Sequence, residues 1–553
     1  MENLTTVIAG SQTLSEFLLT TGLLSEEDMV LIVNQALVLI DELYAHLPLK
    51  KAMHGIDPVQ KLKLLKRRVK GVTERSFHNE MISIFTSLRD LHTNYLLPDP
   101  YRDKIAFLPF LIEEYFDSNK RRYIITKIHR SIIHDTFKAG VEITHWSGIP
   151  IDTAISNISD REAGSNEFAR HVRGLDRMTI RPMRMSLPPD EEWVIASYTD
   201  GTDNFEIRLP WQVTDQFDIR LFTSALDEQE DHKFLVSQGI DLLTDITNRV
   251  KKNLFSPESM EIERRVNHLR SNGNATPSII RESLGNISIL PETFEFRVVN
   301  SQNSQFGYVR IRSFTPNPDS FIPEFIRIIS LLPQDGLILD VRGNGGGIIM
   351  NGERMLQLLT SNRVIAENLE FINTEQTLRL SKTERYGGFL KRWRPSIEAA
   401  LFTGAIYSQG FPIEDSNITN AIGQKYTGKV VLITDARCYS TTDIFAAGFQ
   451  DNKIGIILGV DGNTGAGGAN VFTHDLLNDL FGGLTDSPIK PLPHGANMRV
   501  AIRRTIRVND NVGMPVEDMG VIPDKIHKIT RNDLLQGNID MINTAAKILT
   551  NGL

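Results

Sequence analysis

The sequence is short of cysteine and has no long apolar run. Its 553 residues include one cysteine, Cys438, so no disulfide can form within the chain, which is typical of a reducing compartment. Nowhere do about 18 apolar residues follow one another, as a transmembrane helix requires. Residues 1–9 also lack the basic start and apolar run of a signal peptide. We therefore expect a cytoplasmic protein without a membrane partner.

Basic residues are not in excess either. Lysine and arginine number 60 against 68 aspartates and glutamates, which gives a net charge of -8. A nucleic-acid partner is not expected, because phosphate binding depends on clustered positive charge. No group of histidines, cysteines and carboxylates has the spacing of a metal site, so we expect neither a metal nor another cofactor. The chain is too long for one hydrophobic core, so several domains are expected.

The first hundred residues have the pattern of packed helices. Residues 25–47 place apolar side chains at helical spacing, and Ser25 is a good N-cap, with Asp28 three positions on as in a capping box. Residues 73–88 show the same apolar periodicity. We therefore predict that residues 1–100 form an N-terminal helical cap.

Short alternating segments predict a β domain over residues 105–212. Residues 137–140 lead into a strand at 141–146 and then a turn at 147–150, and this run resembles a PDZ domain. The resemblance also implies a loop near the start of this domain whose N–H groups receive a peptide carboxylate. This loop consists of Phe107, Leu108, Pro109 and Phe110. An ordinary buried strand start explains the same apolar residues equally well.

Residues 213–300 are charged and mostly helical, and we interpret them as a connecting region. From residue 301 to 553, apolar strands alternate with helices, which is typical of an α/β layer with parallel strands. The strands are expected at 308–314, 337–341, 429–434 and 454–459. The helices are expected at 321–332, 352–359, 441–450 and 532–549.

Two turns at the carboxyl ends of these strands have unusual residues, and ligands of parallel sheets bind at such ends. The first runs Leu339-Asp340-Val341-Arg342-Gly343-Asn344-Gly345-Gly346-Gly347. Its glycines leave backbone N–H groups free to bind an anion or an oxyanion. A phosphate-binding P-loop is excluded, because no Gly-Lys-Ser/Thr follows.

The second turn precedes the helix expected at 441–450 and places Ser440 at its N-cap. A serine there often does no more than cap the helix. Its hydroxyl also lies at the positive end of the helix dipole, where the Thr441 N–H could bind a developing oxyanion. Cys438, two residues earlier, is a rival nucleophile, although a lone cysteine is more often a small buried apolar residue.

Taken together and in order, these segments resemble the core of the C-terminal processing (tail-specific) peptidases and of the tricorn core protease. The matching segments are 307–314, 339–347, 440–451, 454–459, 464–468 and the Glu-x-x-Gly-Val-x-Pro-Asp motif at 517–524. The resemblance implies an α/β fold related to the ClpP and crotonase core, with the helical cap and an inserted PDZ-like domain. It also implies a serine peptidase with Ser440 as its nucleophile.

The general base distinguishes the branches of this family. Bacterial processing peptidases have a lysine after the Thr-x-Gly turn, and residues 462–470 contain none. The tricorn-like branch takes a histidine from the N-terminal side, and Asp90-Leu91-His92-Thr93 resembles its Asp-x-His-Thr segment. The resemblance thus implies His92 as the base and Glu517 as the acid that supports it, with Asp518 as the rival. Thr441, Gly345 and Gly346 would form the oxyanion hole.

The predicted function is therefore that of a serine endopeptidase acting on polypeptides through an acyl-enzyme on Ser440. Two alternatives remain at this stage. A non-proteolytic protein could use the same core to bind a ligand or peptide, or a cysteine hydrolase could use Cys438. Assembly into a homo-oligomer is compatible with the sequence.

Overall fold

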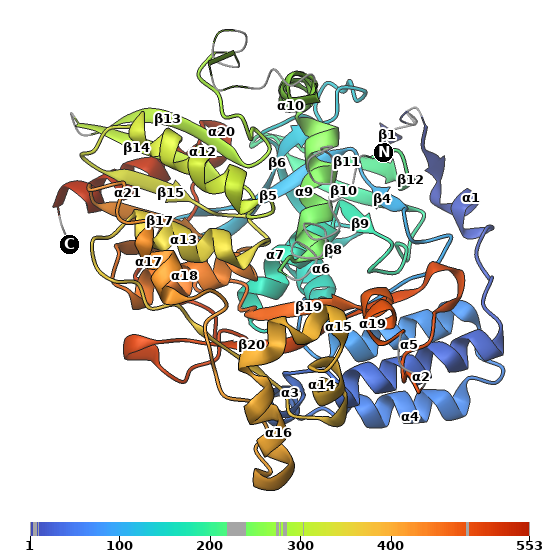
Figure 1. Cartoon of the computed structure of the whole chain (residues 1–553). Coiled ribbons are helices and arrows are strands. Elements are labelled where there is room, and N and C mark those ends of the chain that lie inside the picture. The colour runs from blue at the N-terminus through green and yellow to red at the C-terminus, as the bar shows by residue number, and fades with distance from the viewer. Residues whose placement is uncertain are drawn as a thin grey trace.

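A computed structural model of the chain describes residues 2–3, 8, 10–217, 239–271, 276, 278–279, 282, 285–301, 304–482 and 486–551. Part of the predicted connecting region, residues 218–238, lies outside the described residues. Figure 1 shows the α/β layer on one side of the molecule and the PDZ-like sheet on the other, with the helix α9 (Leu242–Phe255) between them. The blue helices of the cap lie below the PDZ-like sheet in this view.

The N-terminal cap is a bundle of helices. The prediction of two helices is confirmed, and so is the predicted cap of the first: α2 begins after Ser25 with Asp28 completing a capping box, and α5 begins after Thr73. Two further helices lie between them in the chain and were not predicted. The bounds are α1 (Leu14–Leu18), α2 (Glu26–Glu42), α3 (Leu47–His54), α4 (Pro58–Arg68) and α5 (Glu74–Thr86).

Among the described residues, no single helix is long and apolar enough to cross a membrane. Helices α2 and α3, which meet at an angle of 91°, reach the length and apolar composition of a membrane span only when they are taken together. Most of the apolar side chains of α2 pack inside the cap, where Ile32, Val33 and Leu39 are fully buried.

The PDZ-like region consists of two sheets with short helices beside them. The larger sheet has the order β1-β11-β10-β7-β6-β5, with β8 beside β7, and the smaller has the order β2-β12-β4-β9. The first strands of the chain join these sheets, so residues 2–3 and 12–13 lie apart from the helical cap. The bounds are β1 (Glu2–Asn3), β2 (Gln12–Thr13), β4 (Ile105–Phe107), β5 (Phe110–Asp117), β6 (Lys120–Ile128), β7 (Glu142–Trp146), β8 (Ile149–Pro150), α6 (Ile151–Ser159), α7 (Glu167–Arg177), β9 (Ile180–Pro182), β10 (Trp193–Thr199), β11 (Asn204–Pro210) and β12 (Gln212–Thr214).

The α/β layer is a six-stranded sheet in the order β13-β14-β15-β17-β18-β21, parallel except for the β13–β14 hairpin. The predicted alternation of strands and helices is confirmed. Its buried strands are apolar on both faces, because α12, α13 and α18 pack on one face and α21 on the other. The bounds are β13 (Phe294–Ser301), β14 (Ser304–Ile311), α12 (Pro318–Ser330), β15 (Leu337–Asp340), α13 (Ile349–Leu358), β17 (Val430–Thr434), α18 (Thr441–Asp451), β18 (Ile456–Gly459), β21 (Lys525–Ile526), α20 (Arg531–Leu535) and α21 (Ile539–Asn551).

The prediction of one C-terminal helix over 532–549 was wrong in one respect. The chain forms two helices there, and α20 ends before α21 begins at Ile539. Gly537 and Asn538 between them have φ values of 70° and 64°. This left-handed backbone ends a right-handed helix and is tolerated best by glycine and asparagine.

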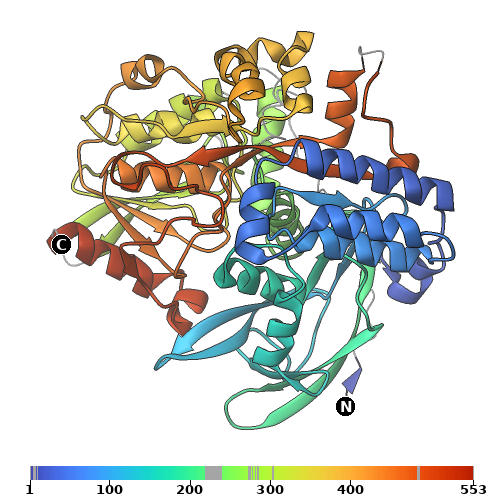
Figure 2. The same ribbon diagram turned by 90° about the horizontal axis from the view of Figure 1, so that it is seen from below.

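A second sheet, not predicted from the sequence, joins the cap to the α/β layer. The long strand β20 pairs with β16 and β19 and, at its start, with β3 from the end of the cap. The pairing is antiparallel and places Tyr95 opposite Met498. Figure 2 shows the blue cap helices against this orange-red ribbon. The bounds are β3 (Asn94–Leu96), β16 (Asn368–Phe371), β19 (Ala469–Thr473) and β20 (Asn497–Ile506).

Of the remaining helices, α10 packs against α9, and the others follow β16 in the chain or flank the second sheet. The bounds are α10 (Pro257–Ser271), α14 (Glu375–Leu380), α15 (Glu384–Gly387), α16 (Arg394–Thr403), α17 (Ser416–Ala421), α19 (His474–Phe481) and, for the 3-10 turns, η2 (Phe389–Arg392), η3 (Pro493–Gly495) and η4 (Asn509–Asn511).

One acidic side chain is buried at the contact between the start of β16 and α18. Neither carboxyl oxygen of Glu367 has a hydrogen-bond partner among the described residues. Gly448 of α18 leaves room for it, since a Cβ there would lie 3.0 Å from Glu367 Oε1. Burial and the charge of Asp451 raise the pKa of Glu367 to about 8. The folded state therefore holds this carboxyl in its neutral form near pH 7.

Replacement of Glu367 by glutamine should stabilise the protein increasingly as the pH rises. The pKa of Glu367 is about 8 when folded and near 4.5 when unfolded, so its contribution to stability falls as the pH rises between these values. The expected gain in unfolding free energy is up to about 1.4 kcal/mol per pH unit. Chemical denaturation at pH 5, 6, 7 and 8 measures it, with half-exposed Glu398→Gln as the control. A gain that does not change with pH would contradict the burial argument.

Candidate active site

The turn between β17 and α18 holds Ser440 in a strained backbone conformation. Ser440 has φ 60° and ψ -122°, and its side chain makes no capping hydrogen bond to the helix. Its hydroxyl is fully buried without a hydrogen-bond partner among the described residues. A serine that served only as a cap would bond to the first turn of the helix. Strain of this kind persists at sites where a side chain must be presented to a ligand.

The glycine turn after β15 lies directly against Ser440. A Cβ at Gly346 would lie 2.8 Å from Ser440 Cβ, and the Gly346 backbone has φ +106°, so this position requires glycine. The Gly346 N–H donates to Asn344 Oδ1 at 2.9 Å. The Thr441 N–H, in the first turn of α18, has no acceptor within its helix. Thr441 is therefore better placed than Gly346 to serve as an oxyanion donor in this conformation.

A backbone segment that precedes α9 covers the glycine turn. The Asp241 N–H donates to the Gly345 carbonyl at 2.8 Å, and the Gly347 N–H donates to the Gly239 carbonyl at 2.5 Å. Ile240 forms an isolated antiparallel bridge with Gly346. This wall of the site was not predicted from the sequence, because nothing in the residues before α9 marks them as partners of the turn.

His92 reaches the same region from the end of the cap. Its ring centroid lies 4.5 Å from that of Tyr439, the residue before Ser440. The ring is fully buried, and neither nitrogen has a hydrogen-bond partner among the described residues. The Ser440–His92 hydrogen bond is therefore not made in this conformation. Catalytic hydrogen bonds are often made only when substrate binds.

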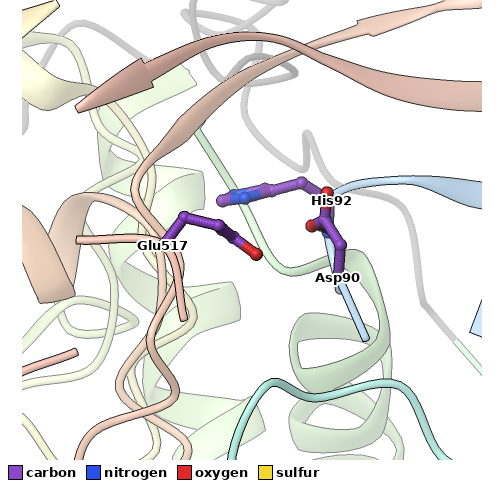
Figure 3. Close-up of side chains that lie close together, drawn as sticks. All are labelled: Asp90, His92 and Glu517. Carbon is purple, nitrogen blue, oxygen red and sulfur yellow. Dashed lines mark hydrogen bonds between the residues drawn. The ribbon is translucent and has the colours of Figure 1, made fainter. Parts of the chain in front are cut away.

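Glu517, rather than Asp518, lies beside His92. A carboxylate oxygen of Asp90, an imidazole nitrogen of His92 and a carboxylate oxygen of Glu517 lie within 4.8 Å of one another. All three residues are buried. Figure 3 shows Asp90 and His92 on one segment facing Glu517 on another. The Asp518 carboxylate, which like that of Glu517 accepts from Lys50, lies 3.4 Å from His54 Nε2 instead. The geometry therefore favours Glu517 as the acid that supports the imidazole.

Asp90 was missed as a site residue, although the Asp-x-His-Thr segment contains it. Its carboxylate accepts the His92 N–H at 2.7 Å and the Thr93 hydroxyl at 2.9 Å, and it lies 3.3 Å from the Tyr439 hydroxyl. Asp90 therefore fixes the turn that carries His92.

The protonation states suit a base that works from its neutral form. Burial lowers the pKa of His92 to about 4, although Asp90 opposes this shift. Burial would raise the pKa of Asp90, but the charges of Lys50, His46 and His92 lower it to about 2. His92 is therefore neutral and Asp90 ionised at neutral pH, as a base and its neighbouring anion should be.

An imidazole and two carboxylates are also the donor set of a zinc site. Two observations oppose a cation here. The Lys50 ammonium lies 2.7 Å from Glu517 Oε1, and Arg499 is close enough to His92 to lower its pKa. A histidine with its supporting acids produces the same grouping without a metal, as in serine hydrolases.

Cys438, the rival nucleophile, and two further histidines, His474 and His494, have structural partners elsewhere. Burial raises the pKa of Cys438 well above its usual value, and its thiol lies 3.2 Å from the Val341 carbonyl, so it is a poor nucleophile. His474 Nε2 lies 2.9 Å from Gln35 Oε1 of α2, and His494 Nε2 lies 3.7 Å from Asp28 Oδ2.

The loop predicted to receive a peptide carboxylate is largely engaged within the protein. Phe107 belongs to β4, and Phe107, Leu108 and Phe110 are fully buried. The Leu108 N–H donates to the Thr179 carbonyl at 2.8 Å, and the Phe110 N–H donates to the Leu108 carbonyl at 2.9 Å. A carboxylate bound there would have to replace these bonds, and the Pro109 nitrogen has no hydrogen to donate.

Comparison with known families identifies two regions of the chain. Residues 104–217 match the PDZ domain, and residues 305–525 match peptidase family S41. Residues 305–525 thus form a peptidase domain of family S41. The protein is a serine peptidase, and the expected α/β fold with an inserted PDZ domain is confirmed. No curated protein sequence matches this S41 peptidase.

Solved structures support the same fold. Mature CPAF complexed with lactacystin is 14% identical to this S41 peptidase, with a TM-score of 0.63 over 95% of this chain and 99% of CPAF. Mature CPAF alone is 13% identical, with a TM-score of 0.64 over 95% and 98% of the two chains. At these identities the similarity shows the fold alone. The tricorn protease is matched with a TM-score of 0.36 at 15% identity, over 95% of this chain and 37% of its own.

Replacement of Gly346 by alanine should lower the rate of peptide hydrolysis by about 100-fold. The added Cβ would lie 2.4 Å from the Gly239 carbonyl oxygen and 2.8 Å from Ser440 Cβ, so the turn or the serine must move. A displacement of this size costs about 100-fold in rate when it misplaces reacting groups. Steady-state hydrolysis of a peptide substrate measures the effect.

Gly343→Ala is the matched control for this variant. Gly343 also has a left-handed backbone, but an added Cβ would find only the Arg310 guanidinium at 3.8 Å. It should keep its activity within about threefold, since the strain costs only about 1–2 kcal/mol of stability. Equal loss in both variants would mean that backbone strain, and not contact with Ser440, governs the turn.

Proposed function

We propose that this S41 peptidase hydrolyses internal peptide bonds of polypeptides through an acyl-enzyme on Ser440. The observation that carries the proposal is the convergence of three segments. A strained serine without a capping bond, a buried neutral imidazole and a buried glutamate come from the core, the cap and a loop near the C-terminus. A serine is a weak nucleophile until a base accepts its proton, so the imidazole is the group that it needs.

Each side chain has a defined role in the proposed reaction. Ser440 Oγ attacks the peptide carbonyl while His92 accepts its proton, and the N–H groups of Thr441 and Gly345 bind the oxyanion. His92 then gives its proton to the leaving amine, and water hydrolyses the ester on Ser440. Glu517 supports the imidazolium that forms twice in this cycle.

Access to the site requires a movement. Ser440, His92 and Glu517 are all 0% exposed, so a peptide reaches the serine only when a covering segment shifts. Residues 239–241, which bond to the glycine turn beside Ser440, form one such segment. Opening and closing of covering segments is a common step in enzymes that exclude water from their sites.

Replacement of Ser440 by alanine should lower kcat by roughly 10⁴-fold or more, as removal of the nucleophile does in serine peptidases. Folding should be unaffected, because the hydroxyl has no partner among the described residues. Peptide hydrolysis and labelling by a fluorophosphonate probe measure the loss. Cys438→Ser should leave hydrolysis intact.

Thr442→Val is the matched control, since the Thr442 hydroxyl is also buried and unpartnered within the described part of the chain. It should keep wild-type turnover. Unchanged turnover in Ser440→Ala would remove the proposal, and loss of turnover in Cys438→Ser would favour a cysteine hydrolase.

The acidic limb of kcat/KM should lie near pH 4 instead of near 6.5. Burial lowers the pKa of His92 to about 4, and a base acts only when it is unprotonated, so activity is lost as the pH falls through that value. The same lowered pKa links protonation of His92 to unfolding. The contribution of neutral His92 to the stability of the folded protein is complete above pH 6.5 and is lost as the pH falls toward 4. Rates from pH 3.5 to 8, with circular dichroism at each pH, separate the two effects. An acidic limb near pH 6.5 in folded protein would show that His92 is not the base, or is not buried during catalysis.

A further inference from the structure

A buried lysine of the cap ties together the two turns that carry the base and its acid. Lys50 lies in α3 and is 0% exposed. Its ammonium donates to the Arg89 carbonyl at 3.0 Å, to Glu517 Oε1 at 2.7 Å and to Asp518 Oδ1 at 2.7 Å. These three bonds use all three N–H groups of the ammonium.

We propose that Lys50 is a positioning residue of this peptidase, which holds Glu517 in place beside His92. The proposal rests on the function proposed above, because it assigns Lys50 a role only through Glu517. Lys50 Nζ bonds to Glu517 Oε1, to Asp518 Oδ1 and to the Arg89 carbonyl, none of which is a reacting atom.

The backbone on both sides of the lysine needs such a restraint. Arg89 has φ 53° and Asp518 has φ 68°, so both turns contain a left-handed residue that is not glycine. Conformations of this kind persist only when the surrounding structure fixes them. Lys50 bonds to the backbone of the first turn and to two carboxylates of the second. It therefore fixes the distance between the segment that carries His92 and the loop that carries Glu517.

Charge gives the second reason for a lysine at this position. Burial, together with Asp90, raises the pKa of Glu517, and Lys50 opposes that shift. Burial lowers the pKa of Lys50 itself, but Glu517 and Asp518 raise it by more. An ionised Glu517 stabilises the imidazolium that forms during the reaction, whereas a protonated one does not. Lys50 is thus the cation that limits the rise in the pKa of this buried carboxyl, which still lies well above its usual value.

The groups that face Glu517 and His92 come from every element around them. The cap contributes Tyr44, His46 and Lys50, the His92 turn contributes Asp90, and the remaining elements contribute Asp241, Tyr439, Arg499 and Asp518. Arg499 donates to the Ile240 carbonyl at 2.7 Å and has no ion pair with Glu517. Lys50 is therefore the cation in contact with Glu517 among the residues that the structure describes.

Replacement of Lys50 by methionine should lower kcat by about 10–100-fold, the usual effect of losing a residue that orients a site group, and leave KM within about twofold. The acidic limb of kcat/KM should move to higher pH, because Lys50 lowers the pKa of both Glu517 and His92. Lys51→Met is the matched control. Lys51 is the next residue along α3, and its side chain is 40% exposed beside Asp57. It should change neither kcat nor the pH profile.

Two further variants keep the test decisive if Lys50→Met folds poorly. The Lys50→Met, Asp518→Asn pair removes one positive and one negative charge, so the buried cluster keeps its charge balance, and it should show the same loss of kcat and the same pH shift. Asp518→Asn alone keeps the Lys50–Glu517 ion pair and should retain kcat within about threefold. A loss in Asp518→Asn as large as that of the pair would overturn the assignment.

A double-mutant cycle tests whether Lys50 acts through Glu517. In a Glu517→Gln background, Lys50→Met should lower kcat by less than about threefold. An undiminished loss in that background overturns the proposal, and so does a wild-type kcat and pH profile in Lys50→Met. If Ser440→Ala is inactive while Lys50→Met behaves as wild type, the positioning role alone fails. If Ser440→Ala remains active, the proposed function fails.

Discussion

The antiparallel pairing of β3 with β20 is the constraint on which the site depends. It joins the last residues of the cap to a strand that also pairs with β16 and β19, so the turn just before β3 is held against the α/β layer. The Thr93 hydroxyl accepts the Ala501 N–H at 3.1 Å, and the Ala45 N–H donates to the Ala501 carbonyl at 2.8 Å. His92 lies in this turn. Without the pairing, the imidazole would have no fixed place relative to Ser440.

The site is assembled from groups that would each be costly to bury alone. An ammonium, several carboxylates and neutral imidazoles share a volume with 0% exposure. Burial of any one charge without a partner is strongly unfavourable, and removal of one partner leaves another uncompensated. The cluster therefore couples folding to function, because the bonds that satisfy Lys50 are the bonds that set the distance between the two turns. The stability of the cap and the geometry of the base cannot vary independently.

The sequence predicted those parts of the fold that follow from local patterns. Ser25 and Asp28 predicted the start of α2, and apolar strands followed by glycine or by Ser440 predicted the parallel sheet and its two functional turns. The break at Gly537 was missed, since a glycine within a helical pattern does not by itself show that the next residue is also left-handed. The second sheet was missed because its strands come from segments far apart in the chain. Pairing between such segments depends on tertiary packing, which no local pattern records.

The same limit explains which site residues the sequence could supply. His92 and Glu517 were reached only through motifs that resemble a family, because neither has a local pattern that marks it. Ser440 also stood out by its position between a predicted strand and a predicted helix. Lys50 belongs to no motif, and its partner Glu517 lies 467 residues away. Its role follows from burial instead. A fully buried lysine must be paired, and its partners here are Glu517 and the backbone of the turn that precedes His92. A residue that no pattern singles out can thus be assigned a role once its charge is located.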